Sequence, residues 1–324
     1  MRCVSVVFTE IYKYLKCKNV KHIAYSNAKK NVLFNEKMPN LNVRSNLFLL
    51  FKRYINLSLS NSEKFIFHST YYRYCKSKNA INVTTLHDFT YEYFRKDLIS
   101  ILHKIQKRNA VKHSKAVICI SNNTKNDLLK FYPKYNGVIK VIYNGYDNEN
   151  YYKLDNVEKK KIILFVGARN SYKRFDFAID LLTKLDDMKF IIIGGGELTK
   201  NEEKILNTKL NNRWEKCSYL SENELCKLYN EATFLCYPSE YEGFGIPVLE
   251  AQACGCPVIC QKKSSIPEVA NDAAIYIDSE DYNSSVNIIK NVLNNKEIYS
   301  KLVDEGLKNV QKKQNRFIQN FMYN

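Results

Sequence analysis

Two glutamates bracket a glycine-containing loop in the last third of this 324-residue chain. Seven residues separate Glu242 from Glu250, and glycines flank Phe244 within that stretch. Glycines let a loop adopt positive φ angles and approach a ligand closely, and Pro247 fits the first turn of a helix. Because the N–H groups at a helix N-terminus attract phosphate, this pattern predicts a diphosphate there, with sugar and ribose hydroxyls on the two carboxylates.

The elements around this loop must bring the two carboxylates to one edge of a sheet. The apolar run that ends at Tyr237 is typical of a strand, and Gly255 followed by Pro257 ends the short helix after barely two turns. Glu250 is then expected in the first helical turn, where a carboxylate can also serve only to stabilise the helix end. Ligands of doubly wound sheets bind beyond the carboxyl ends of the strands, which suits this loop.

Apolar runs of strand length alternate with segments of helical period along the whole chain. Such alternation predicts an α/β protein with parallel sheets, and the length suffices for two domains. Strands are expected at 21–26, 64–68, 81–86, 115–120, 138–143, 162–166, 190–193, 233–237 and 257–260. Helices are expected at 98–115, 175–185, 222–230 and, in the tail, within 284–319. A polar, charged stretch at 151–161 has the composition of a linker.

The stretch Glu242-Gly-Phe-Gly-Ile-Pro-Val-Leu-Glu250 resembles the E-x7-E signature of glycosyltransferase family 4, and the resemblance extends over most of the chain. It implies the GT-B fold, in which two Rossmann-like, doubly wound domains face each other across a cleft. It also implies retaining transfer from a nucleotide-sugar donor, with no metal or other cofactor. Glu242 is then expected to contact the donor sugar, and Glu250 the ribose hydroxyls. The N–H groups of Phe244, Gly245 and Ile246 are expected to face the sugar and the phosphates.

A second segment resembles the part of this family that meets the donor diphosphate. Phe165-Val-Gly-Ala-Arg-Asn-Ser-Tyr-Lys-Arg-Phe175 is similar to the family's strand and basic loop. The resemblance assigns donor binding to Gly167, and the diphosphate to Arg169 and Lys173. Fixed cations would stabilise the charge that develops on the leaving diphosphate, although loop cations are often only solvated.

Three further segments agree with the family. Thr85-Leu-His-Asp-Phe89 resembles its His-Asp segment, so His87 is expected to hold the sugar hydroxyls or to stabilise an oxocarbenium ion through its backbone carbonyl. A histidine at a strand end can also be purely structural. Ile118–Asp127 resembles a strand followed by a helix capped at Ser121, and Ile266–Ala270 resembles a helix start. The candidate catalytic residues are Glu242, His87, Arg169 and Lys173.

The domain organisation follows from the same resemblance. The segment 141–147 resembles the hinge, which sets the expected domains at 1–147 and 148–324, with the last helix packing back on the first domain. At the other end, 9–15 resembles the family's first helix, and 1–8 contains no glycine. The family's first strand and glycine-rich loop are therefore expected to be absent.

The chain carries 50 Lys and Arg against 33 Asp and Glu, a net charge of +17. This favours an anionic partner, such as a membrane surface or a lipid-linked acceptor, or reflects codon bias toward Lys, Asn, Ile and Tyr. Nucleic acid is not expected as a partner, because no zinc-finger, RNA-recognition or repeat signature is present.

The expected helix at 98–115 combines this charge with apolar residues. Its apolar side chains recur at helical spacing, at Leu98, Ile101, Leu102 and Ile105. Its cations are Lys104, Lys107, Arg108 and Lys112. These basic residues form either a solvated helix face or a contact with an anionic membrane.

Cysteine usage and hydropathy bear on location. Ten cysteines include no CxxC pair and no Cys/His cluster of zinc-ligand spacing, so no metal site is expected and a reducing compartment is favoured. No run approaches the roughly 20 apolar residues of a membrane span, and no signal peptide is recognisable. The expected location is the cytoplasm, either free or peripheral at the inner face of the membrane.

These observations predict a retaining hexosyltransferase acting in surface polysaccharide or lipopolysaccharide synthesis. The donor is expected to be GDP- or UDP-linked, and the acceptor a saccharide or a lipid-linked sugar. The basic loop resembles that of mannosyl enzymes, which favours mannose. One alternative is a catalytically weak or inactive sugar-nucleotide-binding protein. Another is a nucleotide-sugar 2-epimerase, against which the E-x7-E stretch and the lack of an evident acid/base set argue.

Overall fold

The computed structural model describes residues 17–18, 24–26, 41–43, 55–56, 58–59, 61–69, 71–218 and 220–323. The chain forms two compact units, which divide between Val141 and Ile142 inside the expected hinge, and Ser121–Asn123 groups with the second unit. The expectations for segments 1–8 and 9–15 lie outside the described residues. No helix in the described ranges combines the length and the apolar character needed to cross a bilayer.

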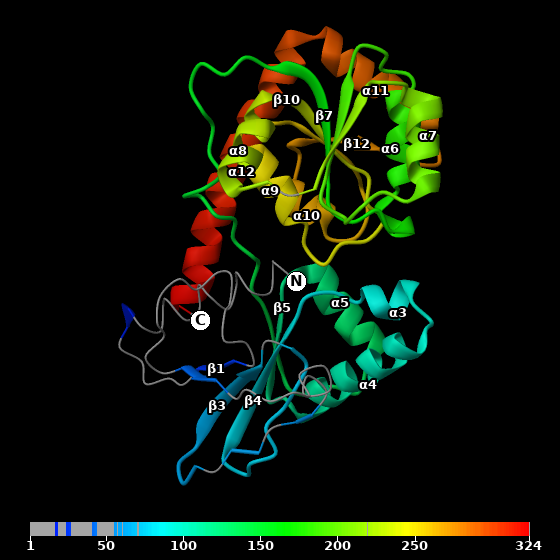
Figure 1. Ribbon diagram of the computed structural model, residues 1–324. Helices are drawn as coiled ribbons and strands as arrows, with labels where there is room; N and C mark the ends of the chain where they lie inside the picture. Colours follow the sequence, from blue (N-terminus) through cyan, green and yellow to red (C-terminus); the bar gives the residue numbers. More distant parts are fainter. Residues whose placement is uncertain are drawn as a thin grey trace. The chain divides into compact units, whose positions relative to one another are not determined.

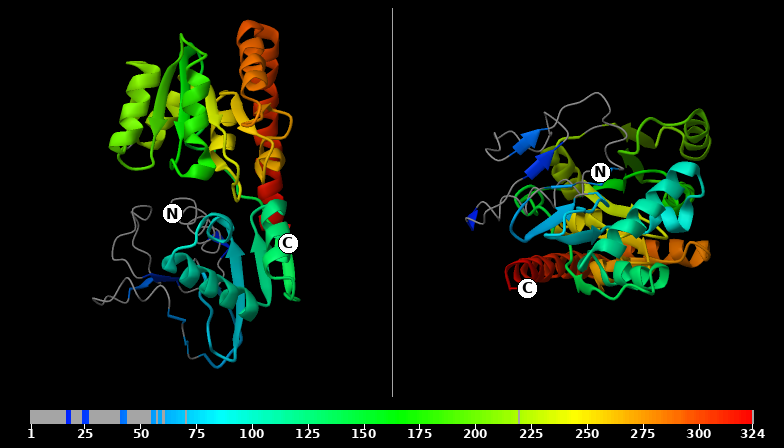
Figure 2. Two further views of the ribbon diagram at one scale, coloured as in Figure 1. Left: turned by 90° about the vertical axis from the view of Figure 1, so that its right-hand side faces the viewer. Right: turned by 90° about the horizontal axis from the view of Figure 1, so that it is seen from below.

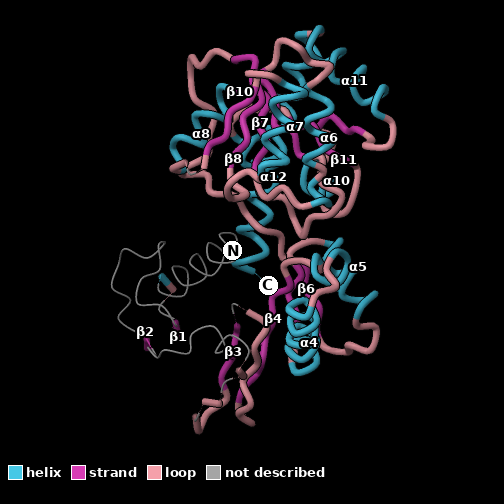
Figure 3. The backbone as a smooth tube through the Cα atoms, turned by 45° about the vertical axis from the view of Figure 1, so that its right-hand side comes forward, coloured by secondary structure: helices cyan, strands magenta, loops and turns pink. Residues whose placement is uncertain are grey.

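The first unit is built on a parallel four-stranded sheet of order β3-β4-β5-β6. Its strands are β3 Phe65–Ser69, β4 Ala80–Leu86, β5 Ala116–Cys119 and β6 Val138–Val141, and each of these expected strands is confirmed. A separate parallel pair joins β1 Ala24–Ser26 to β2 Leu41–Val43. The helices are α3 Thr90–Phe94, α4 Leu98–His113 and α5 Asn122–Phe131 (Figure 3). Asp97 begins α4, because its side chain accepts a hydrogen bond from the Ser100 amide at 2.9 Å.

The second unit has a six-stranded, all-parallel sheet of order β12-β11-β10-β7-β8-β9. Its strands are β7 Lys160–Val166, β8 Lys189–Ile193, β9 Trp214–Cys217, β10 Ala232–Tyr237, β11 Val258–Gln261 and β12 Ala274–Ile277. The strand order reverses between β7 and β10, which is the doubly wound Rossmann arrangement. Ligands of such sheets bind at this reversal, beyond the carboxyl ends of the strands.

Helices cover both faces of this second sheet. They are α6 Phe175–Leu182, α7 Lys200–Leu210, α8 Glu222–Glu231, α9 Ile246–Ala253, α10 Ile266–Ala270, α11 Tyr282–Asn294 and α12 Lys296–Tyr323. Figure 1 shows α6, α7 and α11 on one face, and α8, α9 and α12 on the other. In Figure 2 the long helix α12 runs beside α9 of the same unit. All six residues of β10 are buried, as a strand covered on both faces requires.

Local signals explain where the structure departs from the expected elements. α7 and β9 were not expected, yet Thr199 and Glu202 form a capping box that begins α7. The tail breaks into two helices at Asn295, whose side-chain oxygen accepts hydrogen bonds from the amides of Glu297 and Ile298 at 3.0 and 3.1 Å. α12 is part of the second unit, and its expected packing on the first domain stays a prediction.

Candidate functional site

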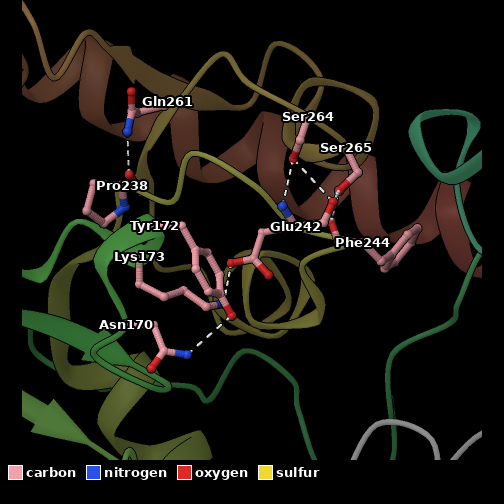
Figure 4. A network of polar contacts seen from close by, with 9 residues as sticks. All are labelled: Asn170, Tyr172, Lys173, Pro238, Glu242, Phe244, Gln261, Ser264 and Ser265. Carbon is pink, nitrogen blue, oxygen red and sulfur yellow. Dashed lines mark hydrogen bonds and ion pairs between the residues drawn. The ribbon is translucent and has the colours of Figure 1, made fainter. Parts of the chain in front are cut away.

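Two loops meet where the strand order of the second unit reverses. One follows β7 and spans 167–174, with a 3-10 turn at Ser171–Lys173, and the other follows β10 and spans 238–245. The ammonium of Lys173 pairs with the carboxylate of Glu242, and the two side chains are only 14 and 12 % exposed (Figure 4). Because β7 and β10 are adjacent and parallel, two segments far apart in the sequence place opposite charges at one edge.

Tyr237 lies close to this ion pair and was not predicted as a site residue. Its ring lies 5.3 Å from the Lys173 ammonium. Burial raises the pKa of Tyr237 well above its ordinary value, and the negative charges of Glu242 and Glu250 raise it further. The phenol therefore stands within the field of both carboxylates. The signal in the sequence was its position as the last residue of a buried strand.

Two adjacent serines shape the loop that carries Glu242. The Ser264 hydroxyl accepts a hydrogen bond from the Glu242 amide at 2.8 Å. The fully buried Ser265 hydroxyl bonds the carbonyls of Glu242 and Phe244, each at 2.9 Å (Figure 4). These contacts fix the backbone on both sides of Gly243. Sequence analysis missed both serines, although they immediately precede the expected helix start at Ile266.

Helix α9 begins and ends where its proline and glycines predicted. Gly245 has φ +103°, and a Cβ at this position would lie 3.0 Å from the Ile266 side chain, so the turn requires glycine. Pro247 lies in the first turn. Gly255 has φ +63°, and the amide of Cys256 bonds the Ala251 carbonyl at 2.8 Å, as in a Schellman motif.

The expected position of Glu250 within α9 was wrong by one turn. The helix begins at Ile246 and its first turn contains no acidic residue, so Glu250 lies in the second turn. The carboxylate accepts a hydrogen bond from the hydroxyl of the fully buried Tyr229 on α8, at 3.2 Å. The buried phenol of Tyr229 thus holds the Glu250 carboxylate, and Glu250 does not cap the N-terminus of α9.

Arg169 makes contacts within the protein that sequence analysis did not foresee. Its guanidinium bonds Glu202 at 2.8 Å and the carbonyls of Gly194, Gly196 and Glu197. Four of the five N–H groups of an arginine can be satisfied in this way. The side chain is 5 % exposed, so Arg169 fastens the glycine turn after β8 to the loop after β7. Its assignment to the diphosphate stays a prediction.

His87 follows β4 in the first unit and has no hydrogen-bond partner on either ring nitrogen among the described residues. Burial lowers the pKa of His87 to about 4, and the charge of Lys107 lowers it while that of Asp88 opposes the shift. The imidazole is therefore neutral near pH 7. A neutral ring offers one donor and one acceptor, which suits uncharged hydroxyls.

Lys107 was expected either to be solvated or to contact a membrane, and this expectation is wrong. Its side chain is fully buried, and its ammonium lies 2.8 Å from both the Glu92 carboxylate and the Asp88 carbonyl. It also lies 4.6 Å from the centre of the Phe89 ring. Lys107 faces inward because it holds the loop that carries His87, and helical spacing alone could not reveal this.

Comparison with known proteins gives the family. Residues 147–309 match the family described as glycosyl transferases group 1, and residues 7–150 match glycosyltransferase family 4. The chain belongs to glycosyltransferase family 4. This family 4 chain is 30 % identical over 212 residues to the O-antigen chain mannosyltransferase RfbU of Salmonella typhimurium, covering 64 % of the chain and 60 % of the relative. It thus spans about three fifths of that relative's length.

A second relative and two solved structures extend the comparison. Over 63 residues, or 19 % of this chain and 16 % of the relative, the identity to O-antigen chain mannosyltransferase B of Escherichia coli is 48 %. Sucrose-phosphate synthase of Thermosynechococcus elongatus superposes with a TM-score of 0.63 at 18 % identity, covering 75 % and 67 % of the two chains. HepE of Anabaena, solved with UDP-glucose, superposes with a TM-score of 0.61 at 16 % identity, covering 75 % of this chain and 72 % of HepE. These structures confirm the GT-B fold of the family 4 chain.

The structure brings only part of the predicted site together. In this family 4 chain, the second unit joins Lys173 to Glu242 and places the Tyr237 ring beside the Lys173 ammonium. Gly167 has φ +124° and its amide bonds the Ile193 carbonyl at 2.9 Å, so it shapes the turn after β7. No three His, Cys, Asp or Glu side chains gather as a metal site in the described part of the chain.

Proposed function

We propose that this chain transfers a sugar from a nucleotide-sugar donor to a saccharide or lipid-linked acceptor during surface polysaccharide synthesis. The observation that carries the proposal is the pairing of Lys173 with Glu242 at the reversal of strand order. A cation and a carboxylate at this edge match the two halves of the donor, because the diphosphate is anionic and the sugar presents hydroxyls. The names of the O-antigen relatives support the polysaccharide setting.

Donor binding would rearrange the ion pair. In the structure Lys173 satisfies Glu242, so a diphosphate that attracts the ammonium would release the carboxylate for sugar hydroxyls. The amides of Gly245 and Ile246 have no acceptor among the described residues, and they lie at the N-terminus of α9, where phosphate is favoured. Glu250, held by Tyr229, would take the ribose hydroxyls. The remaining N–H of Arg169 would add to the diphosphate contacts.

Mannose, retention and a metal-free reaction are finer parts of the same proposal. Both O-antigen relatives are named mannosyltransferases, which supports GDP-mannose as the first donor to try, with UDP-linked donors as the alternative. The leaving phosphate would accept the proton of the acceptor hydroxyl on the face from which it departs. Neutral His87 would hold a sugar hydroxyl. The enzyme would act in the cytoplasm, peripheral to the inner face of the membrane.

Thermal unfolding with UDP, GDP, ADP and their sugar conjugates tests donor binding. A ligand at about 100 times its dissociation constant stabilises a protein by about 2.7 kcal/mol. One nucleotide is expected to raise the midpoint, and Glu250→Ala is expected to remove that shift. Glu203→Ala, which changes an exposed glutamate of α7, serves as the matched control and should leave the shift intact.

Two results would count against the proposal. If no nucleotide stabilises the protein, the donor assignment fails. If a nucleotide binds but no sugar is transferred or hydrolysed in its presence, the chain is a sugar-nucleotide-binding protein. Nuclear magnetic resonance of the product then fixes the anomeric configuration, and an inverted linkage would reject retention.

A further inference from the structure

Helix α4 of the first unit is oriented with its apolar side outward. Leu98 is 83 % exposed and Ile99 is 62 % exposed. Ile101, Leu102 and Ile105 lie on the same face of the helix as Leu98, and each is between 44 and 52 % exposed. Sequence analysis had found the helical spacing of these residues, which usually marks a face that packs on a core. Here that face points to solvent.

The inward side of α4 is polar and is held in place by specific contacts. Its buried residues include Ser100, His103, Gln106 and Lys107. Lys107 forms the buried ion pair with Glu92, and the His103 ring stacks on Tyr91 with centroids 3.9 Å apart. Turning the helix to bury its aliphatic residues would break this ion pair and strand two charges. The outward apolar face is therefore built into the unit.

Charge continues along the exposed face. Arg108 and Lys112 follow Ile105 at spacings of three and seven residues, so they lie on the same side of the helix, and both are exposed. Lys96, just before the helix, is exposed as well, whereas the charge of Arg95 is paired with Asp97 at 3.0 Å. No acidic residue occurs in α4. The face is thus apolar over its first two turns and basic over its last two.

This combination decides which kind of partner fits. A second copy of the chain packed on this face would cover Arg108 and Lys112 together with the aliphatic residues, and α4 offers no acidic residue to pair with them. An anionic lipid surface would accept the aliphatic residues below its headgroups and would attract the cations above them. Contiguous exposed apolar surface of this kind usually marks an interaction site.

We propose that this α4 face, formed by Leu98, Ile101, Leu102 and Ile105 with Arg108 and Lys112, docks the protein onto an anionic membrane surface. Docking extends the acceptor side of the proposed function, since a lipid-linked acceptor is presented at such a surface. It does not depend on which donor binds. The helix lies in the plane of the interface and does not cross the bilayer.

Sedimentation with vesicles tests the docking. The full chain is expected to bind vesicles of equimolar phosphatidylglycerol and phosphatidylcholine, and to bind less as salt is raised. The triple variant I101S/L102S/I105S should bind at least about tenfold more weakly. The control I66S/V138S/I288S removes three other exposed aliphatic side chains and should bind like the unmodified chain. R108Q/K112Q should lose the preference for anionic over pure phosphatidylcholine vesicles.

Several outcomes overturn the inference. It fails if the unmodified chain does not bind the anionic vesicles, or if I101S/L102S/I105S binds as well as the control. It also fails if the chain is a dimer in solution that the same triple variant dissolves, because the face then belongs to a second copy. Nucleotide stabilisation measured on the same preparations separates loss of docking from loss of donor binding.

Discussion

At the residue scale, Lys173 and Glu242 should behave as one unit in turnover. Each satisfies the other in a largely buried site, and each is expected to meet one half of the donor. We expect Lys173→Met and Glu242→Gln each to lower kcat/KM by about 100-fold, the usual loss for removing one electrostatic contact to a transition state. The double variant should lose little more than the worse single variant, because each substitution already disables the partner.

Steady-state kinetics of the double-mutant cycle measure this coupling. Lys184→Met removes an exposed lysine of the same unit and should leave kcat/KM unchanged. Strictly multiplicative losses would show that the two side chains act independently, and the observed ion pair would then carry no catalytic meaning.

Two partly buried histidines make stability depend on pH. Burial lowers the pKa values of His68 and His87 to about 4, from an ordinary value of 6.5. Between these values the unfolded chain binds more protons than the folded chain, so the free energy of unfolding should fall as pH drops from 6.5 toward 4. Each histidine can contribute up to about 3 kcal/mol to this loss.

Urea unfolding at several pH values checks the slope. His68→Gln and His87→Gln should each flatten the dependence, whereas His113→Gln, at an exposed position, should not. An unchanged slope in both the His68 and the His87 variant would mean that other groups govern acid sensitivity.

At the element scale, two glycines in the turn after β8 allow the effect of a steric clash to be separated from the effect of backbone strain. Gly195 and Gly196 have φ +76° and +75°, so alanine at either position meets the same backbone strain, about 1–2 kcal/mol. A Cβ on Gly195 would also lie 2.6 Å from the Arg169 guanidinium and 2.8 Å from the Gly167 carbonyl, while one on Gly196 has no atom within 4 Å.

We therefore expect Gly195→Ala to lower the free energy of unfolding by at least about 1 kcal/mol more than Gly196→Ala. Gly195→Ala should also weaken nucleotide binding, because it displaces both the arginine and the turn at Gly167. Urea unfolding and nucleotide titration of the two variants provide the measurement. Equal losses would show that Arg169 moves aside freely and does not fasten this turn.

Elements were predictable from sequence where a signal is local. Apolar runs located the strands that precede the loops of Lys173 and Glu242, and the proline and glycines predicted both ends of α9. The inward side of α4 could not be found in this way, because helical spacing defines a face but not what covers it. Burial of Lys107 depends on Glu92, and the support of the Glu242 loop depends on Ser265. Such pairings arise only from the tertiary structure.

At the scale of the whole molecule, the predicted site residues are divided between the two units. Lys173, Glu242 and Glu250 belong to the second unit, and His87 belongs to the first. The sequence could group them only through the family resemblance, because no local pattern connects His87 to the E-x7-E stretch. A nucleoside diphosphate alone should therefore act on the second unit, whereas the sugar of a complete donor should also affect the His87 segment.

Hydrogen exchange can resolve these two effects. The nucleoside diphosphate is expected to slow amide exchange in segments 167–174 and 243–248, because its phosphates engage Lys173 and the N-terminus of α9. The matching nucleotide-sugar should in addition slow exchange at 85–89, since the neutral His87 ring, which has no hydrogen-bond partner among the described residues, gains a hydroxyl partner. Strand β6 of the same unit serves as an internal reference for general stabilisation. If segment 85–89 responds equally to both ligands, or only as much as β6 does, His87 does not hold the sugar.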